Sequence, residues 1–162
     1  MKTLIVYATK YGFTGDCVEQ LKTKLEGDST AVNVLTGAVP DIGGFDNVIV
    51  GGSVYMGQIN KKLKEVIAQN LNTLLQKRVA LFICCGMPDN MQTTLENAFP
   101  EELQKNAVAV ECFGGVLDTG KMKMADKMIT SMIKKAVAKE GKPEPAPLPE
   151  NIDKLAKAVN GK

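Results

Sequence analysis

The sequence predicts an α/β protein whose five parallel strands form one sheet, in the order 2-1-3-4-5, between two layers of helices. Two observations predict this three-layer sandwich: short apolar runs rich in branched residues, and the helical patterns of ten or more residues that separate them. Parallel pairing needs such long crossovers, which are right-handed. Ligands of these sheets bind beyond the carboxyl ends of the strands, where the strand order reverses.

The expected strands lack a regular polar alternation, which is typical of strands buried on both faces. They cover residues 2–8, 31–35, 47–53, 78–85 and 107–113. Between them, apolar residues recur at three- and four-residue spacings, which predicts amphipathic helices. These helices cover residues 14–25, 57–75, 91–105, 122–139 and 151–159, and Pro100 breaks the third. Residues 36–45 suit a loop or a single helical turn.

The length of 162 residues suits one domain with a sizeable core. We expect residues 1–141 to form this domain. Four prolines between residues 142 and 149 exclude regular structure there. The segment 142–162 is therefore expected to carry a C-terminal helix that packs on the same domain or is tethered to it.

Composition excludes several kinds of chemistry. The sequence has no histidine, which removes imidazole catalysis and histidine-ligated metals. Its four cysteines show no C-x-x-C spacing, so we expect no metal site. A net charge of +2 argues against general nucleic-acid binding. We expect no catalytic acid, base or nucleophile among the side chains.

The cysteines and the N-terminus bear on location. Adjacent Cys84 and Cys85 allow a strained vicinal disulfide or two reduced thiols, and we favour the thiols. The first apolar stretch is too short for a signal peptide. No run approaches the ~20 apolar residues of a membrane span. A cytoplasmic location is expected.

A hydroxyl-rich turn joins the first strand to the first helix. It consists of Thr9, Lys10, Tyr11, Gly12, Phe13 and Thr14. A helix N-terminus presents unpaired backbone N–H groups and the positive end of the helix dipole, which suits a phosphate. The alternative is an ordinary capping turn before a helix. In either case Thr14 is a plausible N-cap residue.

This turn, T-K-Y-G-F-T, resembles the flavodoxin phosphate loop, whose general form is T/S-x-T-G-x-T. The resemblance implies a flavodoxin-like fold that binds FMN, with Thr9, Gly12 and Thr14 at matching positions. Tyr11 departs from the pattern, because many flavodoxins carry a second threonine there. One hydroxyl donor then comes from a larger ring or is missing.

The loop after the third strand resembles the flavodoxin segment beside the flavin ring. Its residues are Ser53, Val54, Tyr55, Met56 and Gly57. Tyr55 is expected to stack on the ring, unless it is an ordinary loop aromatic, and Met56 is a polarizable neighbour. Gly57 tolerates positive φ, so the Met56–Gly57 peptide can turn over. In flavodoxins such a turn lets a carbonyl accept a hydrogen bond from N5 of the reduced flavin.

The loop after the fourth strand is similar to the flavodoxin C-G-D loop, with Cys85, Gly86 and Met87 in this chain. The resemblance implies backbone N–H groups that bond the pyrimidine edge of the flavin. Met87 replaces an aspartate that is common in the family. With one negative charge fewer near the ring, the redox potential is expected to be less depressed.

Two other phosphate chemistries are disfavoured. Residues 115–121 match G-x-x-x-x-G-K, but Met122 stands where a P-loop needs Ser or Thr for magnesium. A phosphoryl-accepting receiver domain shares the architecture and needs acidic residues after strands 1 and 3. The sequence has Thr9 and Ser53 at those places.

Residues 122–139 form a basic, methionine-rich helical pattern. The apolar stripe of this helix consists of Met128, Ile129, Met132, Ile133, Ala136 and Val137. We expect the stripe to pack on the sheet and the lysines to lie in solvent. Contact of this helix with a membrane surface or an acidic partner is the less favoured alternative.

Two segments, G-G-S-V-Y-M-G at 51–57 and the stretch at 114–135, look like the flavodoxin-domain group that includes the menaquinone-dependent protoporphyrinogen oxidases. In that group a similar segment leads into a basic helix. The porphyrinogen-oxidising members carry a long basic insertion after strand 4, whereas residues 87–106 are shorter and contain several acidic residues. We therefore carry over FMN binding and leave porphyrinogen oxidation open.

The sequence thus predicts an FMN-binding electron-transfer protein, with redox partner proteins or a quinone as its partners. The alternative is a flavin-dependent oxidoreductase of the protoporphyrinogen oxidase type that passes electrons to quinone. Whether the chain is an enzyme stays open at this point. A third class is a scaffold that keeps the fold without binding flavin.

Overall fold

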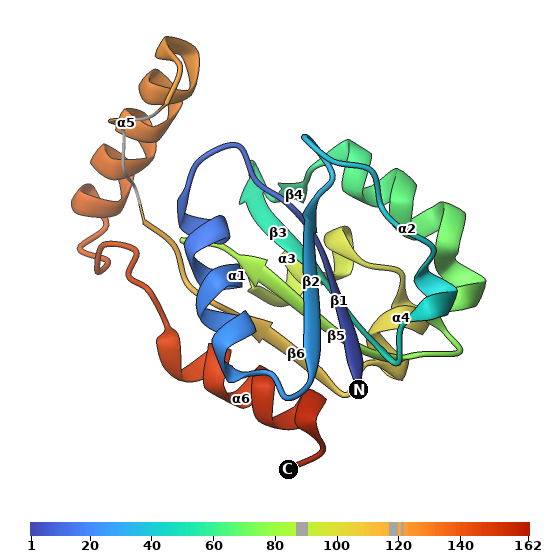
Figure 1. Ribbon diagram of the computed structural model, residues 1–162. Helices are drawn as coiled ribbons and strands as arrows, with labels where there is room; N and C mark the ends of the chain where they lie inside the picture. The colour runs from blue at the N-terminus through green and yellow to red at the C-terminus, as the bar shows by residue number, and fades with distance from the viewer. Residues whose placement is uncertain (87–90, 117–119, 121) are drawn as a thin grey trace.

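The computed structural model describes residues 1–86, 91–116, 120 and 122–162. Five parallel strands form the sheet in the order β2-β1-β3-β5-β6 (Figure 1). They are β1 (Lys2–Ala8), β2 (Asp28–Asn33), β3 (Asn47–Tyr55), β5 (Arg78–Cys84) and β6 (Ala109–Cys112). The predicted fold class and strand order are confirmed, since β5 and β6 are the fourth and fifth parallel strands.

Two layers of helices enclose the sheet (Figure 1). One face carries α1 (Phe13–Lys24) and α6 (Pro149–Asn160), and the other carries α2 (Lys61–Leu74), α3 (Met91–Ala98) and α4 (Glu101–Asn106). Alternate residues of each central strand feed the two cores, because successive side chains of a strand point to opposite faces. In β1, Ile5 packs in the core under α1 and α6, whereas Leu4 and Val6 pack in the core under α2.

Several element bounds differ from the predicted ones. β2 covers Asp28–Asn33 rather than 31–35, because its ladder with β1 runs from Lys2 opposite Asp28 to Tyr7 opposite Asn33. The expected loop at 36–45 contains the single helical turn η1 (Ile42–Gly44). Pro100 separates α3 from α4, as predicted. No disulfide joins Cys84 to Cys85 in this structure.

A short strand that the sequence did not predict follows β3. β4 (Gln58–Ile59) pairs antiparallel with the end of β3. It displaces the start of the expected 57–75 helix, because Asn60 becomes the N-cap of α2 and accepts a hydrogen bond from the Lys62 backbone N–H at 2.9 Å. The prediction of a helix beginning at Gly57 is therefore wrong.

The expectation that helix 122–139 packs its apolar stripe on the sheet is also wrong. This helix, α5 (Met124–Lys139), stands beside the sandwich in Figure 1. Met128 and Met132 of the stripe are each 66% exposed. α6 covers that side of the sheet instead, with Leu155 fully buried beside α1. Among the described residues, no helix is both long and apolar enough to cross a membrane.

We call the described residues 114–116, 120 and 122–148 the α5 excursion, because this part of the chain lies between β6 and the start of α6. Its two ends are joined by backbone hydrogen bonds. The Gly115 N–H donates to the Ala146 carbonyl at 3.2 Å, and the Leu148 N–H donates to the Phe113 carbonyl at 3.0 Å. Gly114 and Pro147 form an antiparallel bridge between them. The excursion therefore has a fixed base at the edge of the sheet.

Candidate functional site

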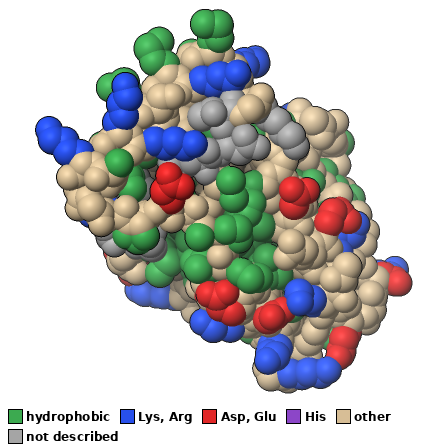
Figure 2. All heavy atoms as spheres, turned by 90° about the vertical axis from the view of Figure 1, so that its left-hand side faces the viewer, with side chains coloured by type: hydrophobic (Ala, Val, Ile, Leu, Met, Phe, Trp, Pro, Cys, Tyr) green, Lys and Arg blue, Asp and Glu red, His purple; other side chains and the backbone are tan. Residues whose placement is uncertain are grey.

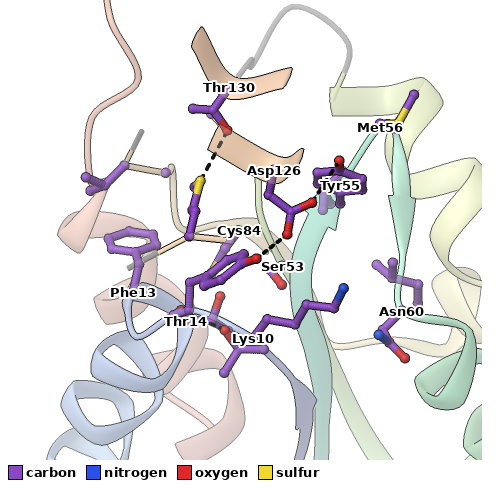
Figure 3. Close-up of a pocket in the computed structure, with 18 of the residues that line it drawn as sticks. Lys10, Phe13, Thr14, Ser53, Tyr55, Met56, Asn60, Cys84, Asp126 and Thr130 are labelled. Atoms are coloured by element: carbon purple, nitrogen blue, oxygen red, sulfur yellow. Dashed lines mark hydrogen bonds between the residues drawn. The ribbon is translucent and has the colours of Figure 1, made fainter. Parts of the chain in front are cut away.

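A cavity of about 360 Å³ lies beyond the carboxyl ends of β1, β3 and β5. This is the edge of the sheet at which parallel α/β folds bind ligands. The walls come from the turn after β1, the β3–β4 hairpin, the end of β5 and α5 (Figure 3). The sequence predicted the first three walls from the three loops, and the fourth comes from the α5 excursion.

The turn after β1 presents an open helix N-terminus to this cavity. α1 begins at Phe13, and Gly12 is its N-cap residue, with no side-chain cap hydrogen bond. Thr14 as N-cap is therefore wrong, because it lies inside the first helical turn and is only 1% exposed. The uncapped N–H groups at the start of a helix are donors for an anion.

An asparagine at the end of β2 holds this turn in place. The Asn33 side chain donates from Nδ2 to the Thr9 carbonyl at 3.0 Å and accepts from the Thr9 N–H at 3.4 Å. The Thr9 hydroxyl donates to the Tyr11 carbonyl at 2.9 Å. Sequence reasoning missed Asn33, for which the only signal is a polar residue at the end of a strand beside the turn.

The Tyr11 side chain points away from the turn after β1 and toward α5. Its hydroxyl donates a hydrogen bond to Asp126 of α5. The hydroxyl of Tyr55 donates to the other carboxylate oxygen of Asp126 at 3.2 Å (Figure 3). The sequence left open whether Tyr11 supplies a hydroxyl to the turn. In this structure that hydroxyl is engaged by α5 instead.

The β3–β4 connection is a two-residue hairpin turn. Tyr55 pairs with Gln58, so Met56 and Gly57 are the turn residues, and both have positive φ, at 50° and 72°. Two positive φ values in succession are typical of a type I′ turn, whose twist matches that of the strands. The turn places Tyr55 and Met56 on the wall of the cavity. Whether the Met56–Gly57 peptide turns over stays a prediction.

The third predicted loop is partly visible. Cys85 and Gly86 follow β5, and Met87 lies outside the described residues, so the prediction on its missing charge cannot be placed on the structure. The base of the α5 excursion packs closely on Gly86. A Cβ on Gly86 would lie 2.9 Å from Pro145, and one on Gly115 would lie 2.8 Å from the Gly86 nitrogen. The excursion thus covers the end of this loop.

Two buried thiols, Cys17 and Cys84, lie near the turn after β1. Cys84 at the end of β5 lines the cavity, and its thiol interacts with the side chains of Cys17 in α1 and of Thr14. The interaction with Cys17 and burial raise the pKa of the Cys84 thiol well above its usual value. Cys84 is therefore a neutral thiol and adds no negative charge to the cavity.

Comparison with known proteins now identifies the family. The profile of the flavodoxin domain matches residues 4–144, which is most of the chain and includes all three predicted loops. The chain belongs to the flavodoxin domain family. No curated protein matches significantly in sequence.

Solved structures of other flavodoxins and flavoproteins share this fold. The solution structure of the two-electron-reduced flavodoxin of Megasphaera elsdenii superposes with a TM-score of 0.56, at 15% identity, and covers 99% of each chain. The FMN complex of a Lactobacillus acidophilus flavoprotein gives 0.55 at 19% identity, covering 68% of this chain and 92% of that one. An NADH:FMN oxidoreductase in its apo form gives 0.59 at 14% identity, covering 99% and 91%.

Most of the predicted site residues of this flavodoxin domain line the cavity. They are Thr9, Lys10, Tyr11, Phe13, Thr14, Ser53, Val54, Tyr55, Met56 and Gly86. Gly12, Gly57 and Cys85 are adjacent in sequence to lining residues and do not line the cavity themselves. Sequence reasoning missed the lining residues that belong to the excursion, chiefly Met122, Asp126 and Ile133. Their role in binding is a prediction for every one of these residues.

Asp126 of α5 and its two partners, Tyr11 and Tyr55, have shifted pKa values. The hydrogen bond from Tyr11 lowers the pKa of Asp126 below its ordinary value of 3.8, and Tyr55, Lys10 and Lys123 act in the same direction. The hydrogen bond to Asp126 raises the pKa of Tyr11. The pKa of Tyr55 is raised mainly by burial and also by its own hydrogen bond to Asp126.

The sign of each shift defines where this contact stabilises the fold. Because the pKa of Asp126 is lowered in the folded protein, its ionised form stabilises the fold at pH values above the unfolded-state pKa. This stabilisation is lost as the pH falls through the folded-state pKa. Because the pKa values of Tyr11 and Tyr55 are raised, their protonated forms stabilise the fold at pH values below the ordinary pKa of 10.0. This stabilisation is lost as the pH rises through the folded-state pKa values. The carboxylate and both phenols are therefore in their bonding forms across neutral pH.

Proposed function

We propose that this chain is an FMN-binding electron-transfer protein of the cytoplasm. The observation that carries the proposal is the uncapped N-terminus of α1 at one part of a cavity whose other wall holds the Tyr55 ring. FMN has a phosphate for the helix N-terminus and a planar ring for stacking. The fold of the FMN-bound Lactobacillus acidophilus flavoprotein supports the same ligand.

The residues present fit this cofactor. The first backbone N–H groups of α1 would hold the phosphate, with Lys10 adding positive charge at the edge of the cavity. Tyr55 would stack on the ring, and Gly86, which lines the cavity, would lie near its polar edge. FMN supplies the electron-transfer chemistry when bound. The side chains bind and orient it and exclude water.

A matched pair of variants tests the phosphate site. Gly12→Asp and Gly12→Asn add side chains of the same shape at the N-cap, and only the first adds negative charge. Repulsion between the aspartate and the phosphate is expected to raise the Kd for FMN about tenfold to 100-fold relative to the asparagine variant. Riboflavin, which lacks the phosphate, should bind both variants alike. Quenching of flavin fluorescence measures all four affinities.

Two outcomes would contradict the proposal. An equal loss of riboflavin and FMN affinity in Gly12→Asp would mean that the α1 N-terminus does not hold the phosphate. A wild-type protein that binds neither flavin would leave the scaffold interpretation, in which the fold is kept without the cofactor. Both titrations belong at low ionic strength, where charge effects are least screened.

The second candidate is a flavin-dependent oxidoreductase of the protoporphyrinogen oxidase type, with a quinone as acceptor. One observation favours it over a carrier for protein partners. The α5 excursion adds an apolar wall to the cavity with Val116, Met122 and Ile133, and such a wall suits an organic substrate beside the ring. A carrier would instead leave the ring edge open to a protein partner.

Stepwise anaerobic reduction of the FMN-loaded protein separates the two candidates. A one-electron carrier is expected to show two resolved steps in the visible absorbance as reductant is added. An enzyme that works with electron pairs is expected to show one step. Two resolved steps would contradict the oxidoreductase, and a single step would contradict the carrier and make porphyrinogens and quinones the first substrates to assay.

A further inference from the structure

Asp126 joins three segments that are far apart in the sequence. Its two carboxylate oxygens accept hydrogen bonds from Tyr11, 115 positions away in the phosphate turn, and from Tyr55, 71 positions away beside the β3–β4 hairpin. We call this group the Asp126 latch. Both tyrosines are predicted FMN-site residues, and all three residues line the same cavity. Figure 3 shows Tyr55 and Asp126 there.

α5 makes few side-chain hydrogen bonds to the sandwich, although its Thr130 and Val137 are buried. Among the described residues, both side-chain hydrogen bonds from α5 to the sheet domain end on Asp126. A third bond, from the Thr130 hydroxyl to the Met122 sulfur at 3.2 Å, stays inside the excursion. Met124 is 85% exposed, and Figure 2 shows lysines and exposed apolar side chains together on the side of the molecule that carries α5.

The polar attachments of the excursion to the sandwich are thus concentrated at two places. The base of the excursion is fixed by the Gly114–Pro147 bridge, and its far part is held by the Asp126 latch. A segment fixed at its base and held by few contacts elsewhere can open without unfolding the domain. Opening would uncover the cavity, because Met122, Asp126 and Thr130 form one of its walls.

We propose that Asp126 is a positioning residue that latches α5 across the mouth of the FMN site, so that flavin enters and leaves when the latch opens. This inference rests on the proposed function for its ligand, though the latch itself does not need flavin. A gate of this kind lowers the association and dissociation rates together and changes the Kd less. It also fixes the ring of Tyr55 through its hydroxyl.

The first test measures FMN exchange in single and double variants. Asp126→Ala, Tyr11→Phe and Tyr55→Phe each remove part of the latch, and the phenylalanines keep the rings. The dissociation rate is expected to rise about tenfold in Asp126→Ala, since hydrogen bonds to a charged group are the strong ones. Adding Tyr11→Phe to Asp126→Ala should give no further rise, because both act through one contact. Ser131→Ala, an exposed position on the same helix, is the matched control.

The second test uses the protein without flavin. Trypsin cleaves after lysine, and α5 carries exposed lysines at 127, 135 and 139. If the latch holds α5, Asp126→Ala should be cleaved in this helix about tenfold faster than the wild type or Ser131→Ala. Far-UV circular dichroism confirms that each variant is folded.

Each outcome bears on a different part of the inference. Unchanged cleavage and unchanged exchange overturn the latch. Faster FMN release with unchanged cleavage also overturns it, because Asp126 would then act on the ligand directly. Slower release in Asp126→Ala would mean that the carboxylate acts only through repulsion of an anionic ligand. Faster cleavage in a chain that binds no flavin supports the latch and removes the proposed function.

Discussion

Replacing Leu155 with alanine is expected to lower the free energy of unfolding by about 3–5 kcal/mol. Leu155 lies on α6, beyond the proline-rich segment, and its side chain is fully buried in the core under the sheet. Truncation removes apolar contacts and leaves a cavity that the packed helices α1 and α6 can fill only in part. The loss is large because α6, not α5, covers this face.

The matched control is Met128→Ala on α5. Met128 belongs to the apolar stripe that the sequence predicts to be buried, yet it is 66% exposed. Its truncation is expected to change the free energy of unfolding by less than about 0.5 kcal/mol. Urea unfolding followed by circular dichroism gives both values. Equal losses in the two variants, or a larger loss at Met128, would refute the arrangement of α5 and α6.

Gly114→Ala is expected to cost about 2–4 kcal/mol and to detach the base of the α5 excursion. Gly114 has φ of 75°, a conformation that costs other residues about 1–2 kcal/mol. An added Cβ would also collide with the Ala146 carbonyl oxygen and come within 3.0 Å of the Leu148 nitrogen. The bridge to Pro147 and its flanking backbone hydrogen bonds would have to open.

Gly141→Ala separates strain from collision. Gly141 follows α5 with φ of 67°, and a Cβ there would meet no heavy atom within 4 Å. It should therefore cost only the conformational part, about 1 kcal/mol. Thermal unfolding of both variants measures the difference. If Gly114→Ala costs no more than Gly141→Ala, the base of the excursion is not fixed as described.

The strands of the sheet could be predicted because each is a local pattern. Continuous apolar runs such as Leu4 to Ala8 identify strands buried on both faces, and the alternation with helices requires parallel pairing. β4 could not be found in the same way, because two residues carry no periodicity. The hairpin turn before it requires a positive φ at Met56. A methionine does not indicate such a turn, since glycine and asparagine are the usual residues there.

The candidate site likewise contains residues that local sequence predicts and residues that only tertiary contacts place there. The three loops follow from the strand order, which places the ends of β1, β3 and β5 at one edge. Asn33 was missed because its bonds to Thr9 depend on the β1–β2 pairing rather than on any motif. Asp126 was missed because it reaches the site only through the position of α5. Nothing in the helical pattern indicates which side chains a polar residue will contact.

The sequence by itself determined the sheet, its order, the turn that leads from β1 into the first helix and the aromatic residue after β3, because these depend on residues close together in the chain. The tertiary structure alone decided that α6 rather than α5 covers the sheet and that the Tyr11 side chain reaches Asp126. An amphipathic stripe shows that a helix has an apolar face but not which surface meets it. This face of the sheet is covered by α1 and one further helix, and α6 rather than α5 takes that second place.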